Sequence, residues 1–172
     1  MNILVVVDMQ NDFIDGSLGT EEAQRIVPEV VKKIQTFDGT VFATRDTHEE
    51  NYLETAEGKK TFRYRHCIRG TEGWQIRQEI SDLLTEAPVD KVTFGSRELV
   101  KKLEQIQEET SIESITLIGL CTDICVISNA MLCKAFLPEV PVQVDASCCA
   151  GVTVESHMQA LEAMKMCQID IL

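Results

Sequence analysis

Residues 3–8 read Ile-Leu-Val-Val-Val-Asp, five apolar side chains in a row that end at a carboxylate. An unbroken apolar run of this length is typical of a parallel strand that is buried on both faces. Residues 21–37 then place apolar side chains at helical spacing, and Asp38-Gly39 breaks this pattern before a second apolar run at residues 40–44. This part of the chain therefore predicts a β-α-β unit.

The same alternation continues along the rest of the chain. Six strands that alternate with helices predict an α/β fold, a three-layer sandwich with helices on both faces of a mostly parallel, Rossmann-type sheet. No linker or repeat divides the sequence, so we expect residues 1–172 to form a single domain. The remaining predicted strands are residues 89–93, 112–120, 140–144 and 169–172, and the remaining predicted helices are residues 74–84, a helix capped by Ser96, residues 123–136 and residues 153–166.

The charge of the chain excludes some classes of partner. Its 28 acidic and 16 basic side chains give a formal net charge of -12. A field of this sign repels nucleic-acid phosphates and anionic membrane surfaces, so we expect neither as a partner. The acidic pairs Glu21-Glu22, Glu49-Glu50 and Glu108-Glu109 are interpreted as solvated helix ends or loops.

The apolar segments and the cysteines bear on the compartment. No apolar run approaches the roughly 20 residues that span a bilayer, and the N-terminal segment lacks the basic start of a signal peptide. The seven cysteines are odd in number and form no CxxC pair, which favours free thiols over a disulfide framework. We therefore expect a cytoplasmic protein.

Three polar residues, Asp8, Lys91 and Cys125, fall within or just after predicted strands. Because the carboxyl ends of parallel strands share one edge of a sheet, the three side chains can converge on one crevice. Cys125 also lies in the first turn of a predicted helix, where free N–H groups and the helix dipole favour a nucleophilic thiolate. Asp8 could carry the thiol proton and Lys91 neutralise developing charge. Taken singly, the same residues also fit a turn cap, a surface lysine and a core thiol.

Three ordered motifs carry a resemblance to a known family. They read Val-Asp-Met-Gln-Asn-Asp-Phe at 7–13, Asp-Lys-Val-Thr-Phe at 90–94 and Gly-Leu-Cys-Thr-Asp-Ile-Cys-Val at 119–126. Together with Asp145-Ala146 and the segment that starts at His157, they resemble the signatures of isochorismatase-like cysteine hydrolases, and most closely the nicotinamidase-related branch. The resemblance spans nearly the whole chain, and it implies an isochorismatase-like fold and a homo-oligomer.

The resemblance also assigns roles to individual residues. It implies a cis peptide bond between Leu120 and Cys121, which would turn the Cys121 N–H toward the Cys125 N–H as a pair of oxyanion-hole donors. Phe13 and Leu120 are the expected substrate-binding residues. The implied catalytic triad is Asp8, Lys91 and Cys125.

The polar stretch 46–73 is a long excursion from a predicted strand end, and long loops in compact domains are usually functional. Its Asp46-x-His48 pair and the later His66 predict an open metal site only weakly. The resemblance to nicotinamidases strengthens this prediction and implies a divalent ion, zinc first and iron or manganese as alternatives, that holds the pyridine nitrogen of the substrate. Glu57 is the expected fourth ligand, with Glu54 second.

One segment departs from the nicotinamidase pattern. Those enzymes commonly carry an aromatic residue and prolines just before the later histidine, where this chain reads Phe62-Arg63-Tyr64-Arg65. We therefore expect this wall of the pocket to differ from that of nicotinamidases. Phe13 is one aromatic wall for a substrate ring, and the sequence does not identify the residue on the opposite side of that ring.

These observations favour a cysteine hydrolase that cleaves a small amide C–N bond through a thioester, with nicotinamide as the leading substrate. One alternative is a related hydrolase that acts on another small amide, a carbamoyl compound or an isochorismate-like substrate. Isochorismate is disfavoured because its cleavage needs no cysteine nucleophile. The other alternative is a non-enzymatic α/β binding module that uses Asp8 and Asp12 for a metal.

Overall fold

A computed structural model describes residues 1–172, and its centre is one sheet of six strands. All neighbouring strands are parallel, in the order β3-β2-β1-β4-β5-β6. The α/β sandwich is therefore confirmed, and the sheet is entirely rather than mostly parallel. The strands are β1 (Asn2–Val7), β2 (Thr40–Asp46), β3 (Val89–Lys91), β4 (Ser114–Leu120), β5 (Val142–Ala150) and β6 (Ile169–Ile171).

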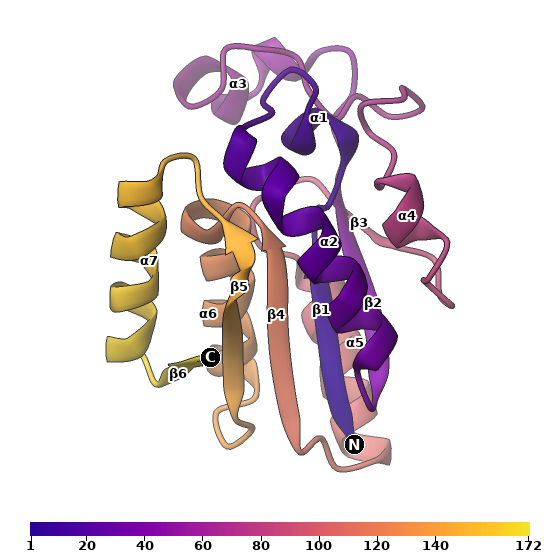
Figure 1. Cartoon of the computed structure of the whole chain (residues 1–172), viewed down its shortest axis with the longest axis vertical. Coiled ribbons are helices and arrows are strands. Elements are labelled where there is room, and N and C mark those ends of the chain that lie inside the picture. Colours follow the sequence, from indigo (N-terminus) through magenta and orange to yellow (C-terminus); the bar gives the residue numbers. More distant parts are fainter.

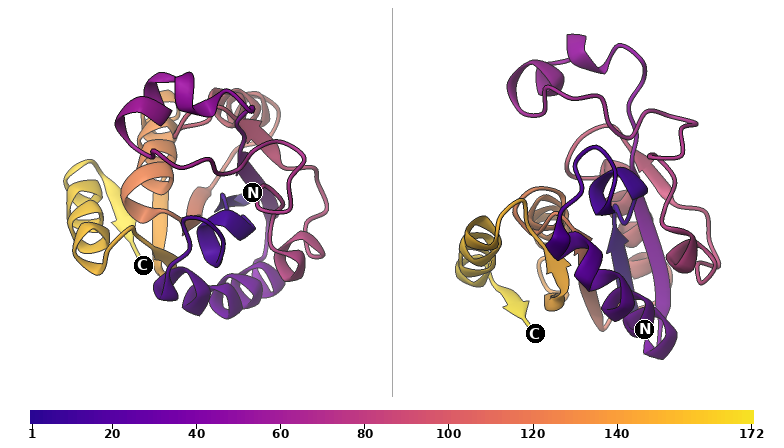
Figure 2. Two further views of the ribbon diagram at one scale, coloured as in Figure 1. Left: turned by 90° about the horizontal axis from the view of Figure 1, so that it is seen from above. Right: turned by 45° about the horizontal axis from the view of Figure 1, so that its top comes forward.

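Helices cover both faces of the sheet (Figures 1 and 2). On one face, α2 and α4 pack over Leu4 and Val6 of β1, and on the other, α5, α6 and α7 belong to the core that contains Ile3, Val5 and Val7. All five of these β1 side chains are fully buried, which is why the run carries no polar alternation. The helices are α1 (Asn11–Ile14), α2 (Glu21–Thr36), α3 (Ala56–Lys60), α4 (Gln78–Ser81), α5 (Arg97–Glu109), α6 (Ile127–Phe136) and α7 (Val154–Met166), with short turns η1 (Tyr52–Glu54) and η2 (Thr122–Val126).

Several boundaries differ from the sequence prediction by a few residues, and three predicted elements differ by more. The predicted helix 74–84 is wrong except for α4, because residues 72–77 instead bond to the segment after β1 through contacts such as Asn11 N–H to Gln75 O. The predicted strand 140–144 becomes the longer β5, and the start of the predicted helix 123–136 is the wider π-type turn η2. Such turns occur often at functional sites.

The strand register gathers the candidate residues at one edge. Val7 pairs with Thr44 of β2 on one side and with Gly119 of β4 on the other, so Asp8 leaves the sheet between these two strands. Asp46 is paired with Lys91, the last residue of β3. The excursion that carries η1 and α3 covers this same edge, at the end of the molecule opposite the N-terminus (Figure 1).

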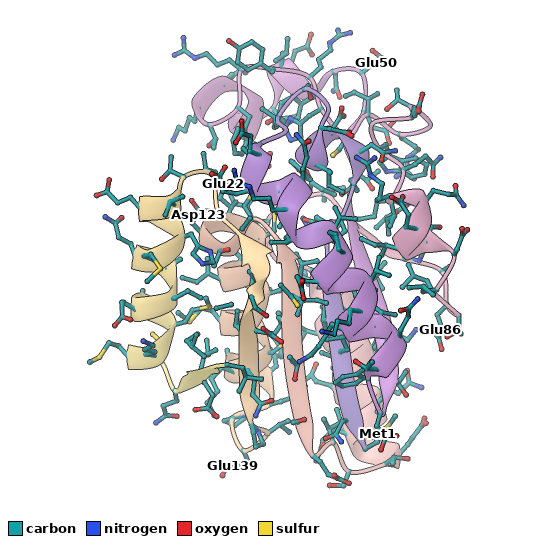
Figure 3. The ribbon with its side chains drawn as sticks, in the orientation of Figure 1. Met1, Glu22, Glu50, Glu86, Asp123 and Glu139 are labelled. Atoms are coloured by element: carbon teal, nitrogen blue, oxygen red, sulfur yellow. The ribbon has the colours of Figure 1, made fainter.

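The acidic pairs lie at the surface, as expected from the sequence for solvated helix ends and loops. Glu21, Glu49, Glu50, Glu108 and Glu109 are exposed, and Figure 3 shows Glu50 at the top of the molecule, in the excursion itself. None of the helices has the length and apolar character needed to cross a membrane.

Candidate active site

The structure brings Asp8, Lys91 and Cys125 together. Lys91 Nζ lies 2.7 Å from Asp8 Oδ2 and 3.4 Å from Cys125 Sγ. All three side chains are buried, from 0% exposure for Asp8 to 5% for Cys125, so bulk water does not screen their charges. A carboxylate, an ammonium and a thiol thus meet in a buried crevice at the carboxyl ends of β1 and β3 and at the turn after β4.

Asp8 is held by its backbone as well as by its charge. Its φ of +47° lies in the left-handed region, which costs an ordinary residue on the order of 1 kcal/mol and persists where surrounding structure enforces it. Thr44 Oγ1 donates a 2.7 Å hydrogen bond to Oδ1, which leaves Oδ2 toward Lys91. Burial raises the pKa of Asp8, although the Lys91 charge opposes that rise. The carboxylate is therefore more basic than a solvated aspartate.

The surroundings of Cys125 favour the protonated thiol rather than the thiolate that its position at a helix start suggested. Burial and the Asp8 carboxylate raise the pKa of its thiol well above the ordinary value, and the opposing Lys91 charge does not reverse this. The expectation of a resting thiolate is therefore wrong, because desolvation outweighs the favourable backbone dipoles. A base must remove the proton when the sulfur attacks.

Lys91 remains protonated at this place. Burial alone would lower the pKa of its amine, but the charges of Asp8 and Asp46 raise it well above its usual value. Its Nζ also donates to Thr93 O at 3.2 Å and contacts Asp46 Oδ1 at 3.1 Å. The cation is thus fixed among negative or acidic neighbours.

The backbone before Cys125 has an unusual course. The peptide bond between Leu120 and Cys121 is cis, as the family resemblance implied. Gly119 before it has a φ of +116°, and a Cβ there would lie 2.2 Å from Val7 O of the neighbouring strand. Only glycine fits this close approach of β4 to β1.

A second cluster, which we call the ligand quartet, consists of Asp46, His48, Glu57 and His66. One donor atom from each lies within 4.8 Å of the others. His48 Nε2 is 2.9 Å from Asp46 Oδ2 and 3.5 Å from Glu57 Oε1. His66 Nδ1 donates to Tyr64 O at 3.0 Å, which directs Nε2 toward Asp46. All four predicted ligands are thus assembled, and Glu57 rather than Glu54 joins the group.

The donors of the quartet fit a divalent metal ion. Two imidazole nitrogens and two carboxylates are a set that zinc, iron and manganese accept. The neighbouring His48, His66 and Lys91 hold the pKa of the Asp46 carboxyl well below its usual range despite its burial, so this ligand is ionised. Tyr52, fully buried, donates to Glu57 Oε1 at 3.1 Å and steadies the fourth ligand.

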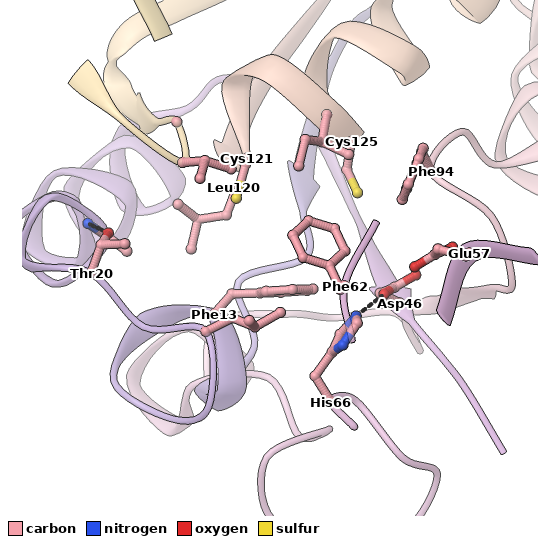
Figure 4. Close-up of a pocket in the computed structure, with 15 residues that line it drawn as sticks. Phe13, Thr20, Asp46, Glu57, Phe62, His66, Phe94, Leu120, Cys121 and Cys125 are labelled. Atoms are coloured by element: carbon pink, nitrogen blue, oxygen red, sulfur yellow. Dashed lines mark hydrogen bonds and ion pairs between the residues drawn. The ribbon is translucent and has the colours of Figure 1, made fainter. Parts of the chain in front are cut away.

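One pocket connects the two groups. Its lining includes Cys125 and the quartet members Asp46, Glu57 and His66. Figure 4 shows Cys125 and His66 on opposite sides, with the rings of Phe13 and Phe62 between them. The predicted substrate-binding residues Phe13 and Leu120 both line the pocket. The remaining lining residues are Leu18, Thr20, Ala23, Phe94, Cys121, Ile124, Gly151 and Val152.

Sequence reasoning missed Phe62 and Phe94 as pocket walls. Phe62 lies in the segment that departs from the nicotinamidase pattern, so an aromatic side chain four residues before His66 was the available signal. Phe94 follows Lys91 by three residues and was quoted only as part of a motif.

Asp12 and His157 belong to neither cluster and form hydrogen bonds elsewhere. Asp12 does not join Asp8 in a metal site, as the binding-module alternative required, because its Oδ2 accepts the Cys67 N–H at 2.7 Å. His157 Nδ1 hydrogen-bonds Thr122 Oγ1 at 2.7 Å, beside η2. All seven cysteines are free thiols.

Comparison with known proteins also relates this chain to isochorismatase-like hydrolases and nicotinamidases. A family model described as "Isochorismatase domain" matches residues 2–172. The nicotinamidase of Schizosaccharomyces pombe is 24% identical over 98% of this chain and 91% of its own length. The nicotinamidase/pyrazinamidase of Mycobacterium tuberculosis is 23% identical over 99% of this chain and 98% of its own. The crystal structure of the Pyrococcus horikoshii pyrazinamidase in complex with zinc superposes with a TM-score of 0.81 at 28% identity, covering 99% of this chain and 98% of that one.

Proposed function

Because this chain belongs to the isochorismatase family, we propose that it is a nicotinamidase-like cysteine hydrolase that converts a small aromatic carboxamide to its acid and ammonia. It is a hydrolase of carbon–nitrogen bonds other than peptide bonds, as are its nicotinamidase and pyrazinamidase relatives. One observation carries the proposal: a single pocket joins the buried thiol of Cys125 to the quartet residues Asp46, Glu57 and His66.

The first half of the reaction forms a thioester. Asp8 takes the thiol proton of Cys125 as the sulfur attacks the carbonyl carbon, and the raised pKa of Asp8 suits it to this role. The backbone N–H groups of Cys121 and Cys125 are the proposed donors to the oxyanion, and each such donor contributes about 3–4 kcal/mol. The C–N bond then breaks, and the Asp8 proton passes to the departing nitrogen, which leaves as ammonia.

The second half releases the acid. Asp8, again a carboxylate, takes a proton from a water molecule that attacks the thioester carbon. The C–S bond then breaks, the acid leaves, and Asp8 passes this proton to the sulfur, which restores the Cys125 thiol and the Asp8 carboxylate. Lys91 lies 2.7 Å from Asp8 and 3.4 Å from the sulfur, so its fixed charge stabilises negative charge on whichever of the two carries it. Lys91 itself keeps its proton throughout.

The other end of the pocket would select the substrate. Asp46, His48, Glu57 and His66 would hold a divalent ion, which when bound supplies a Lewis-acid site for a ring nitrogen. The rings of Phe13 and Phe62 provide flat apolar walls for an aromatic ring. A planar amide with a heteroatom away from the carboxamide, such as nicotinamide, matches both the metal site and the apolar walls.

Ammonia release from nicotinamide by the zinc-loaded enzyme tests the proposal. Wild type should release ammonia and Cys125→Ala should not, while Cys167→Ala, which removes an exposed thiol, should match wild type. Equal release by wild type and Cys125→Ala would refute the thioester mechanism. Release from another small amide or a carbamoyl compound, with none from nicotinamide, would transfer the same mechanism to that substrate.

Two further expectations accompany this proposal. We expect a homo-oligomer, which sedimentation in solution measures directly, and a cytoplasmic location, which fractionation measures. The substrate is a small molecule in every version of the proposal.

A further inference from the structure

The segment after β1 does more than carry Asp8. Gln10 is fully buried, and its amide reaches across to the end of β2. Gln10 Oε1 accepts the Asp46 N–H at 2.7 Å, and Gln10 Nε2 donates to Asp46 O at 2.8 Å. One side chain therefore holds both backbone polar groups of Asp46. A second bond from Nε2, to Trp74 O at 2.8 Å, fixes the amide in this orientation.

Asp12, two residues further on, holds the other side of the quartet. Its Oδ2 accepts the Cys67 N–H at 2.7 Å, next to the ligand His66. Cys67 has a φ of +48°, an unfavourable conformation for a residue with a side chain, so the bond restrains a strained turn. Cys67 O in turn accepts the His48 N–H at 2.9 Å. The single carboxylate of Asp12 thus orders the backbone beside His66 and, one bond further, that of His48.

The excursion leaves room for Asp12 at a specific point. A Cβ on Gly73 would lie 2.3 Å from the Asp12 carboxylate oxygens, so glycine is required there while Asp12 keeps this position. Asp12 N–H also donates to Gly73 O at 2.9 Å. The excursion is therefore fitted around Asp12 from both directions, at Cys67 and at Gly73.

We propose that Gln10 and Asp12 are positioning residues that hold the ligand quartet in fixed relation to Asp8. His66 lies in no helix or strand, so without such bonds its place would depend on a long irregular loop. The segment 8–12 instead ties the catalytic acid, the end of β2 and the turn at Cys67 into one unit. This inference rests on the proposed metal site, but not on the identity of the substrate.

Zinc affinity of the folded apoprotein tests the proposal, measured by competition with a chromophoric chelator. Gln10→Met and Asp12→Ala should each bind zinc about 10–100-fold more weakly than wild type, the usual effect of losing a residue that orients metal ligands. Asp12→Asn keeps an oxygen acceptor for the Cys67 N–H and should recover most of the affinity. Asn11→Ala is the matched control, because Asn11 bonds Glu72 O from the same segment but touches no ligand.

A second readout separates positioning from general damage. The rate at which iodoacetamide alkylates Cys125 in the apoprotein should stay within about twofold of wild type in Asp12→Ala, because Asp12 does not contact Lys91 or Cys125. Zinc affinities that agree within twofold across all variants would overturn the proposal, as would equal weakening by Asn11→Ala or a failure of Asp12→Asn to exceed Asp12→Ala. A wild type that binds zinc but hydrolyses no amide would contradict the proposed function and leave this inference standing.

Discussion

Lys91 Nζ lies 3.1 Å from Asp46 Oδ1, so the cation beside Cys125 also contacts a carboxylate of the ligand quartet. The other oxygen of Asp46 faces His48 at 2.9 Å. Asp46 is therefore shared by the two halves of the site. Because β2 and β3 pair Asp46 with Lys91 in register, the sheet itself sets this contact.

Replacement of Lys91 should damage both catalysis and stability. Lys91→Met leaves Asp8 and Asp46 buried without a cation, which costs about 3–5 kcal/mol in the free energy of unfolding. It should also lower kcat/KM by roughly 100-fold or more. Urea unfolding and steady-state ammonia release measure the two effects. Lys101→Met, which breaks an exposed pair with Glu98, is the control and should change stability by less than about 1 kcal/mol.

The pH dependence of kcat/KM should report Asp8. The rate requires the carboxylate form, and burial raises the pKa of this group, so activity should disappear on the acid side at a pH above the usual range of aspartate titration. Asp8→Asn should lose about 100- to 10,000-fold in rate and show no such acid limb in any residual activity. An acid limb that persists unchanged in Asp8→Asn would assign it to another group.

Metal binding should raise the free energy of unfolding of the protein. Apoprotein prepared with a chelator should unfold at a lower temperature than protein with zinc, and a free zinc concentration of 100 times Kd should add about 2.7 kcal/mol. His66→Asn removes one ligand and should abolish most of this increment while leaving the apoprotein folded. Scanning calorimetry with and without zinc measures it, and an equal increment in His66→Asn would exclude the quartet as the site.

Two glycines offer a matched pair of stability tests. Gly119→Ala should lower the free energy of unfolding by more than about 3 kcal/mol, because the substitution combines a positive φ with a Cβ placed 2.2 Å from Val7 O. Gly70→Ala also has a positive φ but nothing within 4 Å, so it should cost only about 1 kcal/mol. Denaturant midpoints compare them, and equal losses would show that the close approach of β1 and β4 relaxes readily.

The aromatic wall should act on substrate binding rather than on chemistry. Phe62→Leu removes a ring from the pocket, and a ring contact contributes about 0.5–1.5 kcal/mol, so KM for nicotinamide should rise about 2- to 12-fold with kcat little changed. Phe136→Leu alters an exposed ring that does not line the pocket and serves as the control. A large fall in kcat without a change in KM would argue that Phe62 positions Cys125 instead.

Much of the fold could be predicted because its signals are local. Apolar runs such as residues 3–7 and 114–120 become central strands, and the end of each run marks where Asp8 and the turn of Cys125 leave the sheet. The excursion behaves differently. Residues 74–77 carry helical propensity, but their backbone bonds go to Met9 and Asn11, partners more than sixty residues away in sequence. Propensity cannot show such contacts.

The site was predictable in its membership but not in its electrostatics. Motif spacing and family resemblance named Cys125 and the four residues of the quartet. The raised pKa of the Cys125 thiol depends on its burial and on the nearby Asp8 charge, which only the packed structure shows. The role of Phe62 also depended on how the loop before His66 turns into the pocket.

The division of the site between sheet and excursion has a consequence for protein engineering. The proposed catalytic residues Asp8, Lys91 and Cys125 come from the sheet scaffold, at β1, β3 and the turn after β4. Three of the quartet and Phe62 instead come from the stretch between Asp46 and Val89. We expect that exchange of this stretch for that of another family member, with junctions at these two residues, would change the substrate preference. Such a graft would need to keep a backbone N–H that can donate to Asp12 and a glycine at the place of Gly73.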